Sequence, residues 1–190
     1  MNISLYTLTS PLHDENSVNA ASAEFIARIE AELGADMAFR GPDFTKYGTG
    51  ALDVIYVRTG GTEGLFKEVY PRQQGPVLLL TSGKSNSLAA SMEILSYLNQ
   101  QGCKGEIIHG TPAYIADRLR LLSKVHEARQ FLNGKNLGII GQPSDWLISS
   151  EPDKAALKER LGLNLVDVPI NELIELVSSD EDLSAYSHPE

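Results

Sequence analysis

The chain has 190 residues, of which 42% are hydrophobic, so it is long enough to bury the core of one domain or of one domain with a small appendage. Its 16 basic and 25 acidic residues give a net charge of −9. Because nucleic-acid phosphates and anionic membranes are bound by basic surfaces, this charge balance argues against both kinds of partner.

The cysteine count and the start of the chain bear on its cellular location. Cys103 is the only cysteine, so no internal disulfide forms. The opening residues 1–6 contain neither a basic region nor a long apolar stretch, and no segment approaches the ~20 apolar residues that a membrane helix needs. We therefore expect a cytoplasmic protein.

In the first half of the chain, short apolar runs alternate with amphipathic stretches. The apolar runs predict strands at Ile3–Leu8, Asp36–Arg40, Asp53–Arg58 and Pro76–Thr81. Helices are expected from a cap at Ser17 to Gly34, over Thr62–Val69, and after the turn Ser82–Ser87. The Asp53–Arg58 run is β-branched and almost continuously apolar, which is typical of a strand covered on both faces.

The second half repeats this alternation. Strands are expected at Glu106–His109, Asn136–Ile140 and Asn164–Val168. Helices are expected at Thr111–Leu132, near Asp153–Leu161 and near Ile170–Val177. The final residues, 178–190, are acidic and polar and are typical of a linker or a truncated connection.

The order of these elements predicts the fold class. Strands and helices that alternate at this spacing imply right-handed crossovers and an α/β fold. We expect a three-layer, doubly wound, mostly parallel sheet of the flavodoxin-like or Rossmann-like type. One domain would span residues 1–177, followed by the linker over 178–190.

In such sheets, ligands bind in the turns that follow the strands, so these turns hold the candidate site residues. The richest turn follows the Asp53–Arg58 strand and contributes Arg58, Thr59, Gly60, Thr62 and Glu63. A guanidinium, two hydroxyls, a carboxylate and close-approaching backbone could bind a polyol or a phosphate. The alternative is a tight turn in which Thr62 caps a helix and the carboxylate of Glu63 is favoured by the helix dipole.

Two further turns contribute candidates. Ser85 and Asn86 begin a helix and could line a cleft, although the full spacing of a P-loop is missing. In Ser144, Asp145 and Trp146, the tryptophan could stack on a sugar face while its neighbours bind hydroxyls. The alternative is a core tryptophan beside a capping aspartate.

No catalytic or metal-binding motif is evident. His13, Glu63 and His109 would form a metal site only if their strands were neighbours, and a metal needs three or more convergent ligands. No nucleophile–base pair stands out. We therefore assign neither catalytic residues nor metal ligands to this chain.

Three segments carry a family resemblance: Tyr56–Glu63, Val77–Leu80 with the following Ser85–Ala90, and Leu137–Ile148. In their order and spacing they resemble the N-terminal part of the L-fucose isomerase/L-arabinose isomerase-like family, over roughly Ile3 to Val177. The family interconverts aldoses and ketoses with a divalent metal, usually manganese, held by residues of later domains.

The resemblance implies an N-terminal domain that contributes to sugar recognition and oligomer assembly but is not catalytic alone. Its expected partners are a small sugar, further C-terminal domains of the same protein and other copies of the chain. Two alternatives remain open. One is a flavodoxin-like ligand-binding or regulatory module without isomerase chemistry, and the other is a small independent enzyme acting at the Arg58–Glu63 turn.

Overall fold

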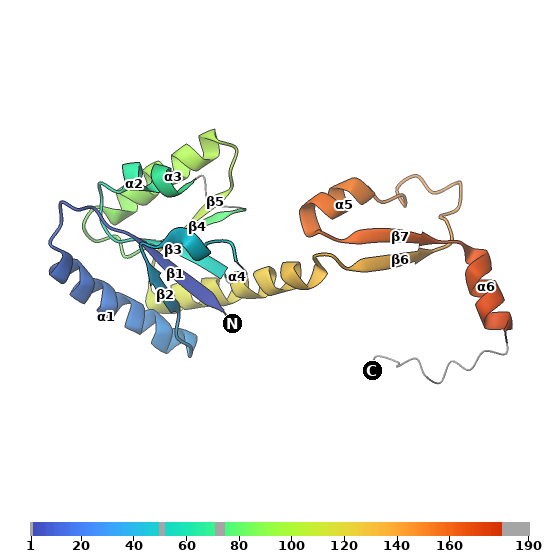
Figure 1. Ribbon diagram of the computed structural model, residues 1–190, viewed down its shortest axis with the longest axis horizontal. Coiled ribbons are helices and arrows are strands. Elements are labelled where there is room, and N and C mark those ends of the chain that lie inside the picture. The colour runs from blue at the N-terminus through green and yellow to red at the C-terminus, as the bar shows by residue number, and fades with distance from the viewer. Residues whose placement is uncertain (1, 50–51, 71–74, 180–190) are drawn as a thin grey trace. The chain divides into compact units, whose positions relative to one another are not determined.

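The computed structural model describes residues 2–49, 52–70 and 75–179 (Figure 1). The chain forms two compact units, residues 1–127 and 128–190, and each unit has a sheet of its own. The sequence predicted one domain over 1–177, and whether the two units act as one domain stays a prediction. Apart from residues 178 and 179, the expected linker lies outside the described residues.

The first unit is built on a five-stranded, all-parallel sheet with the strand order β2-β1-β3-β4-β5. Its strands are β1 (Ile3–Leu8), β2 (Ala38–Gly41), β3 (Leu52–Val57), β4 (Val77–Thr81) and β5 (Gly105–Ile108). This order is the flavodoxin-like topology, so the predicted fold class is confirmed. The strands β1, β3 and β4 lie in the middle, which explains the almost continuous apolar sequences of β3 and β4.

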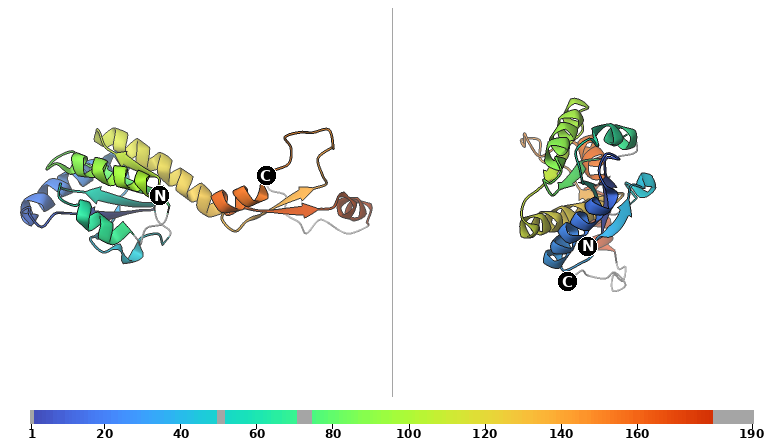
Figure 2. Two further views of the ribbon diagram at one scale, coloured as in Figure 1. Left: turned by 90° about the horizontal axis from the view of Figure 1, so that it is seen from above. Right: turned by 90° about the vertical axis from the view of Figure 1, so that its left-hand side faces the viewer.

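Helices cover both faces of this sheet. They are α1 (Glu15–Leu33), the 3-10 helix η1 (Phe44–Lys46), α2 (Glu63–Val69), α3 (Ser87–Gln100) and α4 (Pro112–Leu132). The helices α1 and α4 lie on one face, and α2 and α3 lie on the other (Figures 1 and 2).

Because neighbouring strand residues point to opposite faces, β1 and β3 supply both layers of the core. Leu5 and Val54 pack toward α1 and α4, whereas Tyr6 and Ile55 pack toward η1, α2 and α3. All four of these side chains are buried. Core packing on both faces therefore fixes the positions of the strands, and the residues at the strand ends are well placed to support a site.

Helix α1 is anchored firmly at one end only. It begins at Glu15, because the Asp14 carboxylate accepts a hydrogen bond from the Ser17 N–H at 2.8 Å, so the expectation that Ser17 is the cap is wrong. In the C-terminal half, Ile29 and Leu33 are buried. In the N-terminal half, the residues that face the sheet, Val18 and Ser22, are only half-buried, and so are Phe25 and Ile26 just past the middle of the helix. The N-terminal half of α1 therefore packs loosely.

The second unit contains a separate sheet of two parallel strands, β6 (Asn136–Ile140) and β7 (Asn164–Val168), with the helices α5 (Lys154–Leu161) and α6 (Ile170–Ser178). None of the residues 128–179 is buried. Parallel sheets are normally covered on both faces, and a two-stranded sheet is marginally stable by itself. Within the described residues, the second unit therefore has no buried core of its own.

Candidate ligand-binding site

Three loops of the first unit begin side by side at the carboxyl edge of the sheet. The paired residues Leu8, Val57 and Thr81 end β1, β3 and β4 in register. The chain order reverses direction between β1 and β3, because β2 lies on one side of β1 and β3 on the other. This switch point is the place where open parallel sheets bind ligands, and the candidate turns after β3 and β4 both start there.

Hydrogen bonds join the β1 and β3 loops. The Ser10 N–H donates to the Thr59 hydroxyl at 2.9 Å, and the Thr62 hydroxyl donates to the Thr59 carbonyl at 3.2 Å. Both threonine side chains are fully buried. Thr59 and Thr62, both predicted as site residues, thus support the edge of the site from below. Each hydroxyl already has a hydrogen-bond partner within the protein.

The β3 and β4 loops are joined just as closely. The Gly60 N–H donates to the Ser85 carbonyl at 2.7 Å. A Cβ at Gly60 would lie 3.0 Å from the Asn86 Cβ, so the two loops can approach this closely because residue 60 is a glycine. Ser85 and Asn86, on the other side of this contact, have left-handed backbone conformations, with φ of 52° and 58°. Non-glycine residues in this region carry strain and occur often at functional sites.

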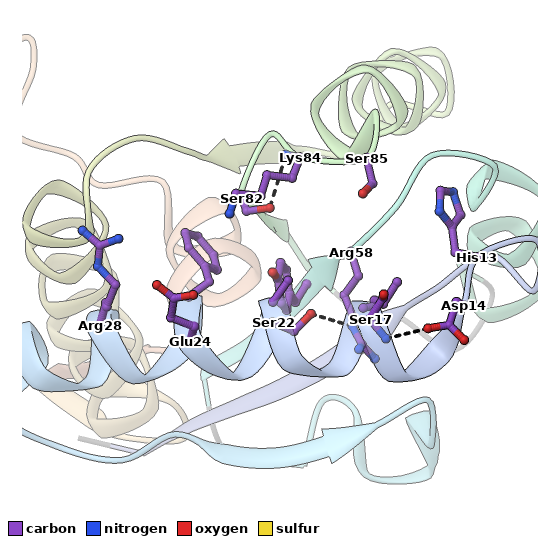
Figure 3. Close-up of a pocket in the computed structure, with 14 residues that line it drawn as sticks. His13, Asp14, Ser17, Ser22, Glu24, Arg28, Arg58, Ser82, Lys84 and Ser85 are labelled. Carbon is purple, nitrogen blue, oxygen red and sulfur yellow. Dashed lines mark hydrogen bonds between the residues drawn. The ribbon is translucent and has the colours of Figure 1, made fainter.

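A cavity of about 380 Å³ opens between α1 and these loops (Figure 3), and we call it the first cavity. Its lining comes from the β1–α1 loop, one flank of α1 and the ends of β3 and β4. The lining residues are His13, Asp14, Ser17, Val18, Ala21, Ser22, Glu24, Phe25, Arg28, Tyr56, Arg58, Ser82, Lys84 and Ser85. It therefore lies at the edge that the strand order indicates.

Arg58 connects the sheet to α1 across the wall of the first cavity. Its Nε donates to the Ser22 Oγ at 2.9 Å, and its Nη2 donates to the Asn19 Oδ1 at 2.5 Å. The sequence predicted Arg58 as a ligand-binding side chain. The structure places it in the cavity wall, where its two hydrogen bonds connect the sheet to the loosely packed half of α1.

The first cavity has an excess of cations. Arg28, Arg58 and Lys84 line it together with the carboxylates of Asp14 and Glu24, whereas the whole chain has a net charge of −9. Among the described residues, neither the Arg28 guanidinium nor the Lys84 ammonium forms a hydrogen bond or ion pair. These two donors are therefore available to a ligand.

Hydroxyl and aromatic groups complete the lining. Ser17, Ser82 and Ser85 present hydroxyls from two sides of the first cavity (Figure 3). The rings of Phe25 and Tyr56 pack with their centroids 5.5 Å apart and give the cavity an apolar wall. Hydroxyl-binding groups opposite an aromatic surface suit a compact polyol such as a sugar ring.

The structure brings together only some of the predicted site residues. Arg58 and Ser85 line the first cavity. Its edge is supported by Thr59, Gly60, Thr62 and Asn86. Glu63 begins α2 and does not line the cavity. Ser144, Asp145 and Trp146 belong to the second unit. There Trp146 is 80% exposed, so the alternative of a core tryptophan is wrong.

Sequence reasoning missed the contribution of α1. Ser17, Phe25 and Arg28 line the first cavity, and Ser22 forms part of its wall. The available signal was weak: Ser22 interrupts the apolar stripe of α1 four residues after Val18, on the same helical face. A polar residue on the face toward the sheet needs a partner, and Arg58 supplies it.

The described part of the chain offers neither a metal site nor a membrane span. No group of three or more of its His, Cys, Asp or Glu side chains is arranged to hold a metal ion. No helix within it has both the length and the apolar character needed to cross a membrane. His109, one of the candidate metal-binding histidines, instead lies with its Nδ1 3.0 Å from the Thr81 carbonyl.

In comparisons with known proteins, no protein-family model matches the chain, and no curated protein matches it. The function proposed below therefore rests on the fold, on the geometry of the first cavity and on the resemblance of the three sequence segments.

Proposed function

We propose that this chain is the N-terminal part of an aldose–ketose isomerase-like protein, and that its first unit recognises a sugar without catalysing a reaction by itself. The observation that carries the proposal is the first cavity. It lies at the carboxyl ends of β1, β3 and β4 and combines serine hydroxyls, cationic donors and an aromatic wall. The hydroxyls of a sugar can bind the serine and cationic side chains, and the apolar face of its ring can pack on Phe25.

The assembly part of the proposal is supported by the second unit. Many of its large apolar side chains are exposed, and none of the residues 128–179 is buried. We propose that further domains of the same protein, together with other copies of the chain, cover this surface. The isomerase chemistry and its manganese would then belong to those further domains.

The alternative is a flavodoxin-like binding or regulatory module without isomerase chemistry. One observation favours it: the excess of cations in the first cavity is more than a neutral sugar requires and would suit a phosphate or a carboxylate. Binding of a sugar phosphate or free phosphate, with no binding of the neutral sugar, would support this alternative.

Turnover and binding together test the proposal. With added manganese, the chain is expected to convert no aldose to its ketose, while aldoses still bind to it with measurable affinity. Measurable turnover would contradict the non-catalytic role, and absence of binding across a panel of aldoses and ketoses would contradict the recognition role.

A further inference from the structure

Two cations of the first cavity, Arg28 and Lys84, are not required for binding a neutral sugar. Arg28 lies on α1 and Lys84 lies in the β4–α3 loop, so they reach the cavity from two different walls (Figure 3). Within the described residues, neither cation has a hydrogen-bond or ion-pair partner. Neutral side chains suffice to bind the hydroxyls of a sugar, so a pair of cations indicates that the ligand carries a negative charge.

The position of Arg28 relates this charge to the aromatic wall of the cavity. Arg28 follows Phe25 by three residues on α1, and both line the first cavity. Residues three apart are neighbours on one face of a helix, separated by about 4.5 Å along its axis. A sugar ring that packs on Phe25 can therefore direct a charged substituent to Arg28. Ser82 and Lys84 line the cavity from the facing loop and add a hydroxyl and an ammonium.

The number and placement of the cations indicate which anion they suit. A carboxylate is planar, and a single guanidinium binds both of its oxygens. A phosphate ester has three terminal oxygens and a charge of about −1.5 to −2 at pH 7, so it can bind a guanidinium from one wall and an ammonium from the other. The volume of about 380 Å³ is near the lower end of the ~300–1,000 Å³ range of ligand sites, which suits a monosaccharide phosphate better than a nucleotide.

We propose that Arg28 and Lys84 form a phosphate subsite within the first cavity, and that the ligand is an aldose or ketose phosphorylated on its terminal carbon. The sugar ring packs on Phe25, and the phosphate lies between the two cations. This inference rests on the proposed function, because it takes the first cavity as the site of the ring. A phosphate on the terminal carbon leaves the anomeric carbon free, as the interconversion of an aldose and a ketose requires.

Glu24 gives the proposal a direction that can be tested. Its carboxylate also lines the first cavity and precedes Arg28 by four residues, about one helical turn. A negative charge in this place opposes a phosphate but not a neutral ring. Glu24→Gln removes the charge and keeps hydrogen-bonding groups, so it is expected to strengthen the binding of phosphorylated sugars about threefold relative to neutral sugars.

The test compares neutral sugars with their phosphates by titration calorimetry on the full chain, at low salt and about pH 8, where phosphate esters are dianions. The pairs are D-ribose with D-ribose 5-phosphate, D-glucose with D-glucose 6-phosphate and D-fructose with D-fructose 6-phosphate. For at least one pair, the phosphate is expected to bind at least about tenfold more tightly, because hydrogen bonds to charged groups contribute this much. Sodium chloride at about 0.5 M is expected to remove most of the gain.

Charge-removing variants assign the gain to the two cations. Arg28→Gln and Lys84→Gln are each expected to lower the ratio of the two affinities to about threefold, and together to about one. Lys104→Gln is the matched control with the same change of charge. Lys104 is also exposed but directly precedes β5, at the opposite edge of the sheet, so this variant is expected to keep the wild-type ratio.

A further variant verifies that the ligands bind in the first cavity. Ala21 lines the cavity and is exposed on α1. Leucine is a good helix former, so Ala21→Leu fills the cavity while leaving the helix intact, and it is expected to weaken the binding of neutral and phosphorylated sugars alike. Circular dichroism and thermal unfolding verify that all variants are folded.

The outcomes distinguish the two proposals. Absence of binding by every neutral and phosphorylated sugar would overturn the proposed function and the subsite with it. Equal affinities for each sugar and its phosphate would overturn the subsite alone. A gain that persists when Arg28 and Lys84 are both replaced, or that shrinks in Glu24→Gln, would do the same.

Three further ligands test the identity of the anion and the contribution of the ring. D-glucuronate carries a carboxylate on its terminal carbon, and binding as tight as that of D-glucose 6-phosphate would contradict the choice of phosphate. Glycerol 3-phosphate and inorganic phosphate lack the ring. If they bound as tightly as the sugar phosphates and no neutral sugar bound, both proposals would be overturned, because the ring would contribute nothing.

Discussion

The Nε of Arg58, directly after β3, donates a hydrogen bond to the Oγ of Ser22 in the middle of α1, 2.9 Å away. This contact joins the sheet to the loosely packed N-terminal half of α1, and it forms part of the wall of the first cavity. Much of the geometry of the candidate site therefore depends on one guanidinium.

Removal of the acceptor tests this link. Ser22→Ala is expected to lower the free energy of unfolding by about 1 kcal/mol, because a charged donor loses its acceptor in a half-buried place. Amide hydrogen exchange is expected to accelerate in the N-terminal half of α1 and to stay unchanged around the buried Ile29 and Leu33.

Ser17→Ala is the matched control, since Ser17 also lines the first cavity from α1 but its hydroxyl forms no hydrogen bond within the described residues. It is expected to leave exchange as in the wild type. Equal exchange profiles for the two variants would show that Arg58 does not hold the helix.

The left-handed residues of the β4–α3 loop give a second prediction. Ser85→Gly is expected to raise the free energy of unfolding by about 0.5–1 kcal/mol, because glycine adopts a φ of 52° without strain. It is also expected to weaken sugar binding, because a hydroxyl is removed from the first cavity. Urea denaturation and titration calorimetry measure the two effects.

Ser82→Gly provides the comparison in the same loop. Ser82 has no positive φ, and its hydroxyl accepts a hydrogen bond from the Lys84 N–H at 3.3 Å, so this variant is expected to lose stability. If both glycine variants were destabilised to the same extent, the backbone at Ser85 would carry no strain.

A third prediction concerns Gly83, which follows β4 with a φ of +77°. A Cβ there would lie 2.8 Å from the Cε1 of His109, so Gly83→Ala combines backbone strain with a clash. At Gly102, with a φ of +70°, a Cβ would have no neighbour within 4 Å. Gly102→Ala is therefore expected to cost about 1 kcal/mol from backbone strain, and Gly83→Ala at least about 1 kcal/mol more.

The double variant Gly83→Ala/His109→Ala completes this measurement. Removal of the ring relieves the clash, so the two substitutions together are expected to cost less than the sum of the two single costs. Strict additivity in urea denaturation would show that the His109 ring does not pack against Gly83.

Some of these features could be predicted from the sequence. The almost continuously apolar run Asp53–Arg58 predicted a strand covered on both faces, as β3 is, and glycines with hydroxyls after β3 predicted the edge at which the first cavity lies. Apolar runs do not identify a strand's neighbours, so the separate pairing of β6 with β7 was not foreseen.

The cavity itself depends on long-range packing. Ser22 and Arg58 are 36 positions apart, and their contact follows from where α1 crosses the sheet. Hydrophobic periodicity assigned α1 a core-facing stripe, but it could not show that the N-terminal half of the helix packs loosely. The cavity-lining residues of α1 were missed for this reason.

A fourth prediction concerns the pH dependence of stability. Burial raises the pKa of Asp53 above its ordinary value of 3.8, and the hydrogen bond from the Gly48 N–H only partly opposes this shift. The folded state therefore holds the proton more tightly than the unfolded state does. The contribution of Asp53 to stability is fully present below the unfolded pKa and is lost as the pH rises through the raised, folded pKa.

Asp53→Asn tests this sign, because asparagine cannot ionise and its amide oxygen can still accept the Gly48 N–H. In urea denaturation from pH 3.5 to 7, the variant is expected to gain stability relative to the wild type as the pH rises. A loss of relative stability over this range would mean that the charged Asp53 is favoured in the folded state.

The central claim is that the first cavity binds a sugar, and amide chemical shifts test it most directly. The ¹H–¹⁵N spectrum of the labelled chain is recorded with increasing concentrations of aldoses and ketoses, for the wild type and for Ala21→Leu. We expect saturable shifts for at least one sugar at Ser17, Ser22, Lys84 and Ser85, all of which disappear in folded Ala21→Leu. Absence of shifts at these residues for every sugar, or shifts that persist in Ala21→Leu, would contradict the claim.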